Sequence, residues 1–319
     1  MIRAIAAVTT IFAFMQCAWA QGNADAERQS VLRAQVLLDK AHFSPGPIDG
    51  RMGSNTRKAI AALQQSAGLQ SDGRLTTATW RRLEVQEDTP TLVDYAITAE
   101  DIKGPFADVI PDTLKEMANL RELSYTSAEE LLAEKFHMDI DLFKRLNKNK
   151  RLDQAGTTIR VANVERAKVD GLEKIEVDKA LNAVRVLDKS GSILAYFPAT
   201  VGSDDTPSPS GTVEVTRIVR NPSYTYDPSK LNFKGVEATE RFTIAGGPNN
   251  PVGIIWIELS KESYGIHGSP DPAAISRQQS HGCVRLTNWD ALDLAAMIRK
   301  GVQVQFVGDD SDRGQRAAR

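Results

Sequence analysis

One cysteine and two histidines lie close together near the carboxyl end of this chain, which has only two cysteines and four histidines among its 319 residues. Cys283 follows His281 by two positions, and His267 lies a short way upstream, beyond a Pro-Asp-Pro segment. An unperturbed thiol has a pKa of roughly 8.5, which a nearby imidazole or oriented N–H groups can lower. The layout therefore predicts a cysteine nucleophile of lowered pKa with a histidine base.

Glycine next to the candidate nucleophile favours acyl chemistry. Gly282 leaves room for close backbone approach, and the N–H groups of Gly282 and Cys283 could hold the oxyanion of a tetrahedral intermediate. Each such donor typically stabilises the transition state by roughly 3 kcal/mol. Two alternatives stay open on the residues alone. Cys283 can be a small buried apolar residue beside structural histidines, or it can join His267 and His281 in a zinc site, although the second closely spaced ligand pair of structural sites is missing.

Composition indicates an ordinary globular protein with two or three domains. The chain is 41% hydrophobic and 25% charged, with a formal net charge of −2, so it gives no sign of a nucleic-acid partner. Residues 1–20 combine Arg3, an apolar run and a small-residue end, which predicts a cleaved secretory signal, with an uncleaved membrane anchor as the alternative. Cleavage would remove Cys17. Cys283 would then be buried and inert, joined to another chain, or a reactive thiol.

The first half of the chain predicts two small units. Residues 26–86 show helical spacing interrupted by a Pro/Gly-rich loop, which predicts three short helices. Residues 87–94 are polar and predict a linker. Residues 95–165 combine two helices and a strand, and a capping box of Ser127 and Glu130 is expected to open the first helix.

From residue 172 the pattern changes to short alternating strands. These strands, with Gly- and Pro-rich turns such as residues 188–191, predict a mainly β domain over residues 172–307, built as a sandwich or barrel-like core. One prominent helix is expected at residues 289–300, with Asn288 as its N-cap. Residues 308–319 predict a polar tail. The predicted fold class is therefore multidomain, with a mainly β domain preceded by a three-helix module and an α/β segment.

The motifs around the cysteine resemble those of a known family. Ile266-His267-Gly268 followed by Ser280-His281-Gly282-Cys283-Val284-Arg285 resembles the H-G…[S/T]-H-G-C-x-[R/N] signature of YkuD-type L,D-transpeptidases of bacterial cell walls. Residues 26–86 resemble a peptidoglycan-binding module. Residues 95–165 look like a LysM glycan-binding module, with the opening strand missing or displaced to residues 95–102, and a spacer is the competing interpretation.

The resemblance implies acyl transfer through a thioester. Cys283 would attack the carbonyl before the terminal D-alanine of a peptidoglycan tetrapeptide stem, and an amine would then resolve the acyl-enzyme as a 3-3 cross-link or an attached protein. His267 matches the family's general base, oriented by the backbone carbonyl of Gly268. His281 matches a residue that supports the site, and the N–H groups of Gly282 and Cys283 match the oxyanion donors.

The resemblance also implies the substrate contacts and partners. Arg285 would clamp a stem carboxylate, since guanidinium pairs bidentately with carboxylate. Ser280 would fix the loop and Tyr264 would line the groove. No metal or organic cofactor is implied. Peptidoglycan stem peptides and glycan are the expected partners, an outer-membrane protein is a further candidate acceptor, and the periplasm is the expected compartment. The alternatives are an L,D-carboxypeptidase or amidase that uses the same thioester, and a non-catalytic wall-anchoring protein.

Overall fold

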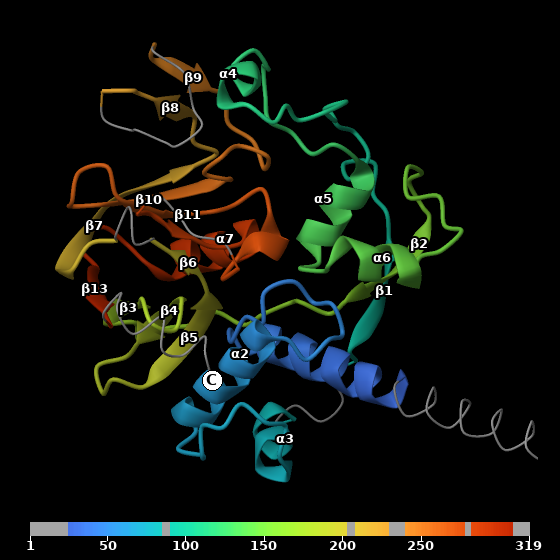
Figure 1. The fold of residues 1–319 in the computed structure, drawn as a ribbon. Helices are drawn as coiled ribbons and strands as arrows, with labels where there is room; N and C mark the ends of the chain where they lie inside the picture. Colours follow the sequence, from blue (N-terminus) through green and yellow to red (C-terminus); the bar gives the residue numbers. More distant parts are fainter. Residues whose placement is uncertain (1–24, 85–89, 203–207, 230–239, 278–281, 309–319) are drawn as a thin grey trace, which may run out of the picture.

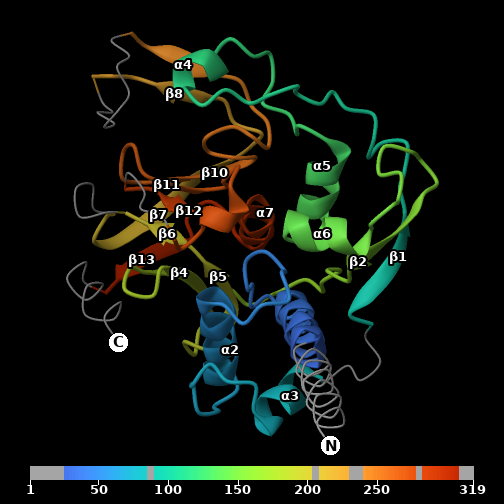
Figure 2. The same cartoon turned by 45° about the vertical axis from the view of Figure 1, so that its right-hand side comes forward.

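The protein is described by a computed structural model that covers residues 25–84, 90–202, 208–229, 240–277 and 282–308. A helical unit, a small α/β unit and a larger β domain pack around the helix α7 (Figures 1 and 2). Several predicted features lie outside the described residues: the signal at residues 1–20, part of the linker, Ser280 with His281, and the tail beyond residue 308.

The helical unit has the three predicted helices, over residues 25–40, α2 (Ser54–Ser66) and α3 (Thr77–Leu83). The loop after the first helix is held from inside by Gln35. Its side-chain Oε1 accepts the N–H of Gly50 at 2.8 Å, and its Nε2 donates to Asp49 Oδ1 at 2.8 Å. Because this buried amide meets both backbone and side-chain groups of the loop, the loop has a fixed shape.

The α/β unit has a strand–helix–helix–strand order with a long excursion after its first strand. In chain order its elements are β1 (Leu92–Ala96), α4 (Leu114–Met117), α5 (Ala128–Lys135), α6 (Ile140–Leu146) and β2 (Thr158–Ala162). Strands β1 and β2 pair antiparallel. The expectation that the opening strand is missing or displaced to residues 95–102 is wrong, because β1 begins at Leu92, inside the predicted linker. The excursion places α4 beside the hairpin of β8 and β9 (Figure 1).

The capping box predicted for α5 forms only in part. Ser127 is the N-cap, and its hydroxyl accepts the N–H of Glu130. The carboxylate of Glu130 does not return to the N–H of Ser127. It accepts the backbone N–H of Thr126 at 2.6 Å instead, one residue earlier in the chain.

The β domain is built on one nine-stranded sheet and confirms the predicted mainly β fold. The sheet order is β5-β4-β3-β13-β7-β10-β11-β12-β6, and β8 pairs with β9 separately. Strand β7 joins the two halves of the sheet, and both halves share one apolar core with α7. The strands are β3 (Lys174–Asp178), β4 (Ala183–Leu187), β5 (Ile193–Pro198), β6 (Thr200–Val201), β7 (Gly211–Arg220), β8 (Tyr224–Tyr226), β9 (Phe242–Ile244), β10 (Ile255–Leu259), β11 (Gly265–His267), β12 (Val284–Arg285) and β13 (Gln303–Val307).

The prominent helix α7 (Asn288–Met297) starts with a different cap from the predicted one. Thr287 is the N-cap, and its hydroxyl accepts the N–H of Asp290 at 3.2 Å. Asn288 is therefore the first helical residue, and its buried side chain is used for contacts outside the helix. The helix also ends at Met297, three residues before the predicted end at residue 300.

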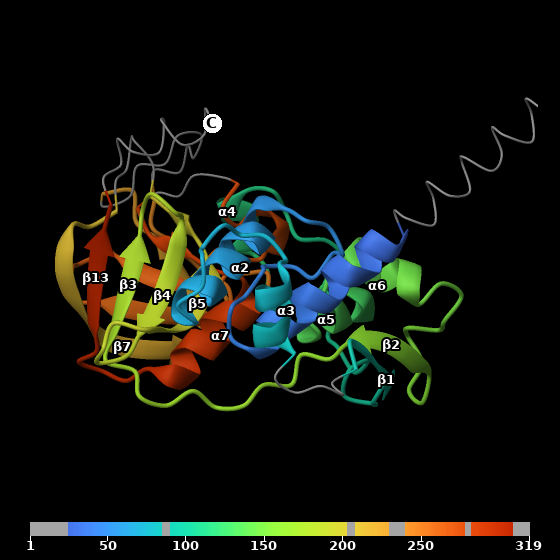
Figure 3. The ribbon, with the colours of Figure 1, turned by 90° about the horizontal axis from the view of Figure 1, so that it is seen from below.

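The helical unit is joined to both of its neighbours by backbone pairing. The N–H of Ser44 donates to the carbonyl of Tyr196 at 2.8 Å, so this loop extends the sheet at its edge strand β5. The N–H of Ile48 donates to the carbonyl of His137 at 2.8 Å in the α/β unit. Figure 3 shows α2 and α3 lying between the β strands and the α/β unit. Since apolar cores are also shared across both junctions, the three units form one packed body.

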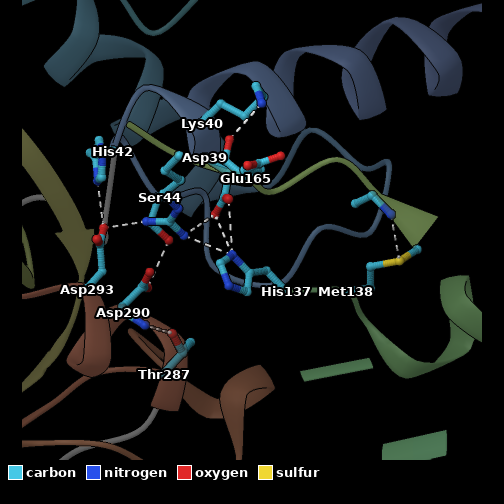
Figure 4. Close-up of polar contacts among 12 residues, drawn as sticks. Asp39, Lys40, His42, Ser44, His137, Met138, Glu165, Thr287, Asp290 and Asp293 are labelled. Atoms are coloured by element: carbon cyan, nitrogen blue, oxygen red, sulfur yellow. Dashed lines mark hydrogen bonds and ion pairs between the residues drawn. The ribbon is translucent and has the colours of Figure 1, made fainter. Parts of the chain in front are cut away.

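Buried charges fill the place where the three units meet (Figure 4). Arg166, from the segment that joins the α/β unit to the β domain, donates to Asp39 Oδ1 at 2.9 Å and to Asp293 of α7. His42 also bonds Asp293 Oδ2 at 2.8 Å, and His137 Nδ1 lies 3.0 Å from Asp39 Oδ2.

None of the described helices has the length and apolarity to span a membrane.

Candidate active site

Two adjacent parallel strands position the predicted nucleophile and base. Strand β11 pairs with β12 so that His267 lies opposite Arg285 and Ile266 lies opposite Val284. Side chains alternate between the faces of a sheet, so Ile266 and Val284 enter the core while His267 and Arg285 share the other face. Cys283 is two residues before Arg285 and therefore lies on that same face. The structure thus brings together three residues that the sequence had singled out.

His267 is held as a neutral imidazole with one nitrogen available. Its Nδ1 lies 2.7 Å from the carbonyl oxygen of Gly268. Because a carbonyl can only accept, Nδ1 carries the proton and Nε2 keeps a lone pair. Burial, followed by the charge of Arg285, lowers the pKa of His267 to about 3. The ring also stacks on Trp256 with the centroids 5.5 Å apart, which fixes its plane. His267 is therefore neutral at pH 7, with Nε2 unprotonated.

The thiol differs from the expectation of a lowered pKa. Burial raises the pKa of Cys283, and the N–H of Gly265 and the charge of Arg285 offset this only in part. The Sγ donates to the carbonyl of Ser263 at 3.8 Å, as a protonated thiol does. The prediction of a resting thiolate is therefore wrong, because the low polarity around the sulfur outweighs its favourable neighbours. Reaction at neutral pH requires that His267 remove the proton as the thiol attacks.

The peptide before the nucleophile is fixed by a side chain that sequence reasoning missed. Ser208, which is buried, donates from its hydroxyl to the carbonyl of Gly282 at 2.7 Å. In a trans peptide the N–H points away from the carbonyl, so this bond also sets the direction of the N–H of Cys283. Gly282 has a φ of 101°, which favours glycine. Ser208 stands in a Pro-rich loop, where a serine looks like any turn residue.

Arg285 lies where it can meet an anionic substrate. Burial lowers the pKa of Arg285, and its Nε has no hydrogen-bond partner among the described residues. Tyr224, which the sequence did not single out, belongs to the same cluster, since burial and the nearby Cys283 raise its pKa to about 12. Tyr264 was predicted to line the groove. Its half-buried ring lies under the Lys261 ammonium, with Nζ 4.9 Å from the centroid.

In the described part of the chain, no group of three or more His, Cys, Asp or Glu side chains is placed to hold a metal ion. His281, the third ligand of the zinc alternative, lies outside that part. The contacts of Cys283 and His267 described above are with backbone groups and Trp256.

The raised pKa of the thiol predicts slow alkylation. At pH 7 Cys283 should be almost entirely protonated, because burial raises the pKa of its thiol above the ordinary value. The rate of reaction with iodoacetamide, followed from pH 6 to 11 beside glutathione, should therefore have its midpoint above that of glutathione. Arg285→Leu should move the midpoint higher still, because it removes a charge that favours the thiolate. A midpoint below pH 8 would instead indicate a resting thiolate–imidazolium pair.

Two family models match the chain. Residues 173–306 match the L,D-transpeptidase catalytic domain (YkuD), and residues 27–83 match a putative peptidoglycan binding domain. Among curated proteins, the putative L,D-transpeptidase YkuD of Bacillus licheniformis is 44% identical over 59 residues, which is 18% of this chain and 36% of that protein. The putative L,D-transpeptidase YkuD of Bacillus subtilis is 30% identical over 118 residues, which is 37% of this chain and 56% of that protein.

These matches are partial. The chain spans about a third to a little over half the length of these two relatives. Among solved structures, an L,D-transpeptidase from Mycobacterium smegmatis is 14% identical, over 50% of this chain and 77% of that chain, with a TM-score of 0.34. That overall similarity is too loose to carry a conclusion. The two family models lie over the β domain and the helical unit.

Proposed function

We propose that the protein modifies peptidoglycan by acyl transfer through a Cys283 thioester, since residues 173–306 match an L,D-transpeptidase catalytic domain and residues 27–83 match a putative peptidoglycan binding domain. The observation that carries the proposal is the neutral His267, held through Nδ1 on the Gly268 carbonyl, on the strand next to the cysteine. The donor is the tetrapeptide stem. The acceptor is an amine of a second stem or of a wall-linked protein, such as one of the outer membrane.

Acylation uses this geometry directly. The Sγ of Cys283 attacks the carbonyl between the third and fourth stem residues, while the proton of the thiol passes to Nε2 of His267. The N–H groups of Gly282 and Cys283 stabilise the oxyanion. When the tetrahedral intermediate collapses, the C–N bond breaks and the D-alanine amine leaves with the proton from His267. A thioester and free D-alanine result.

Transfer reverses the same steps with a new amine. The acceptor nitrogen attacks the thioester carbonyl, loses its proton to His267, and forms the new amide as Cys283 leaves and regains a proton. One amide bond is broken and one is formed, so no energy source or cofactor is consumed. The protonated His267 exists only between steps, which suits a group whose burial and neighbouring Arg285 lower its pKa to about 3.

Binding is proposed to use Arg285 and the helical unit. Arg285, which is half-buried, is proposed to bind a stem carboxylate, and Tyr224 completes that side of the site. The helical unit packs directly on the β domain, so glycan bound there would be presented at a fixed distance from Cys283. We place the protein in the periplasm, where both the donor and the acceptors are found.

The proposal is tested with disaccharide-tetrapeptide as the only substrate. The protein should release D-alanine and form a cross-linked dimer, both measured by liquid chromatography with mass spectrometry. If tripeptide accumulates without a dimer, water is the acceptor and the protein is a hydrolase with the same intermediate. If no D-alanine is released from any tetrapeptide stem, the proposal fails and a wall-anchoring role takes its place.

A further inference from the structure

A buried chain of contacts leads from the α/β unit to the catalytic histidine. We propose that Glu134 of α5 is a positioning residue for acyl transfer: through Asn288 it fixes the Gly268 backbone, whose carbonyl orients His267. The inference rests on the proposed function and deepens it. It gives the α/β unit a role in the reaction that does not require glycan binding.

The side-chain amide of Asn288 is held by three hydrogen bonds. Its Nδ2 donates to Glu134 Oε2 and to the carbonyl of Pro248, both at 3.1 Å. Its Oδ1 accepts the N–H of Ile254 at 3.2 Å. The side chain is 1% exposed, and both N–H groups of the amide are used, so the amide cannot turn without breaking a buried bond.

The side-chain amide of Asn288 packs closely against the backbones of Gly268 and Gly253. A Cβ placed on Gly268 would lie 2.3 Å from Asn288 Oδ1, and one on Gly253 would lie 2.1 Å from the same atom. The N–H of Gly268 also donates to the carbonyl of Ile255 at 3.1 Å. Gly268, whose carbonyl meets His267, is thus held by a strand bond through its own N–H, and Asn288 packs against it.

Glu134 is the partner of Asn288 that comes from outside the β domain. It is 8% exposed, and its Oε2 also accepts the hydroxyl of Tyr125 at 3.3 Å. Burial, together with the charge of the nearby Glu130, raises the pKa of Glu134 to about 8. The hydrogen bonds from Asn288 and Tyr125 lower this pKa, but by less. A neutral acid with one oxygen shared by two donors fits this site. Burying a carboxyl group costs free energy that an apolar side chain of similar size would not cost. This indicates that the acceptor oxygen of Glu134 serves a purpose.

Asn249 provides a matched control at the same junction. Its Nδ2 donates to the carbonyl of Ser124 at 3.0 Å and to Glu130 Oε1 at 2.9 Å, so it also joins the β domain to the α/β unit. These side-chain bonds reach neither Asn288 nor Gly268. Loss of the Asn249 amide should therefore loosen the junction without releasing the His267 carbonyl.

The test compares Glu134→Met, Glu134→Gln and Asn249→Ala. Methionine keeps the volume but accepts no comparable bond, so kcat for D-alanine release should fall by about 10- to 100-fold with KM little changed, the size of effect that misplacing a catalytic group produces. Glutamine keeps the acceptor oxygen and should restore kcat to within about 3-fold of the parent. Asn249→Ala should leave kcat near the parent value. If Glu134→Met does not fold, Glu134→Ala takes its place.

A second readout does not depend on turnover. Nitrogen-15 NMR of labelled histidine should show His267 protonated at Nδ1 in the parent, in Glu134→Gln and in Asn249→Ala, and a mixture of tautomers in Glu134→Met. An unchanged tautomer and kcat in Glu134→Met would overturn the inference, as would an equal loss of kcat in Asn249→Ala. If the parent releases no D-alanine, the proposed function fails, while the tautomer comparison still decides the role of Glu134.

Discussion

Replacing Cys283 by alanine is expected to abolish D-alanine release, with a loss of roughly 10⁴-fold or more, the scale seen when other acyl-transfer enzymes lose their nucleophile. His267→Ala should cost a similar factor. The pKa of the thiol is raised, so without the imidazole the sulfur stays protonated at neutral pH. The two losses should not add in the double variant, because the residues act as one unit. Release of D-alanine is measured by a coupled amino-acid oxidase assay.

Lys261→Ala is a suitable control for this pair. Lys261 is exposed, and its ammonium lies over the ring of Tyr264, outside the strands that carry His267 and Arg285. The control should keep most of the activity. If His267→Ala kept more than a tenth of the parent rate, another group would be the base, and the assignment drawn from the Gly268 hydrogen bond would be wrong.

Asp39→Ala is expected to be the most destabilising single change, at about 3–5 kcal/mol of unfolding free energy. Asp39 is fully buried, and Arg166, with a side chain 8% exposed, bonds it where the three units meet (Figure 4). Although burial alone would raise the pKa of Asp39, the charges of Arg166 and His137 hold it below its ordinary value. Removing Asp39 leaves the guanidinium in the junction with Asp293 as its remaining bonded carboxylate. Urea unfolding of the parent and the variant measures the difference.

The matched control is Glu100→Ala, which removes an ion pair with Lys103 on the surface. Both side chains are more than half exposed, so the loss should stay below about 1 kcal/mol.

The contribution of Asp39 to the free energy of unfolding should depend on pH with a definite sign. Since the folded pKa of Asp39 is lowered, its contribution is present above the unfolded pKa of roughly 3.9 and is lost as the pH falls toward the folded value. A loss below 1 kcal/mol in Asp39→Ala would show that the junction does not hold the units together.

The sequence was sufficient for features whose signal is local. Short alternating strands predicted the mainly β domain because burial on one face of a strand has period two. Cys283 and His267 were found from their types and spacing and Arg285 from the family resemblance, and the structure brings them onto one face because the two short stretches that carry them pair as β11 and β12. The cap of α7 was missed by one residue, since Thr287 and Asn288 are both good N-caps and the contacts of the Asn288 side chain outside the helix decide between them.

Features that depend on contacts between distant segments could not be predicted. Ser208, Tyr224 and Arg166 carry no motif, and each gains its place from a segment far away in the chain. The raised pKa of Cys283 is of the same kind, because the sequence shows the imidazole that would lower it and hides the burial that raises it. Conversely, β1 was misplaced because a five-residue strand with one partner has little pattern of its own.

The most direct test of the account is the intact mass of the protein a few milliseconds to seconds after mixing with disaccharide-tetrapeptide. We expect an adduct equal to the donor minus D-alanine, placed on Cys283 by digestion, lost on addition of an acceptor amine, and absent from Cys283→Ala. D-alanine release with no adduct at any time, or an adduct that persists in Cys283→Ala, would contradict a thioester on this residue.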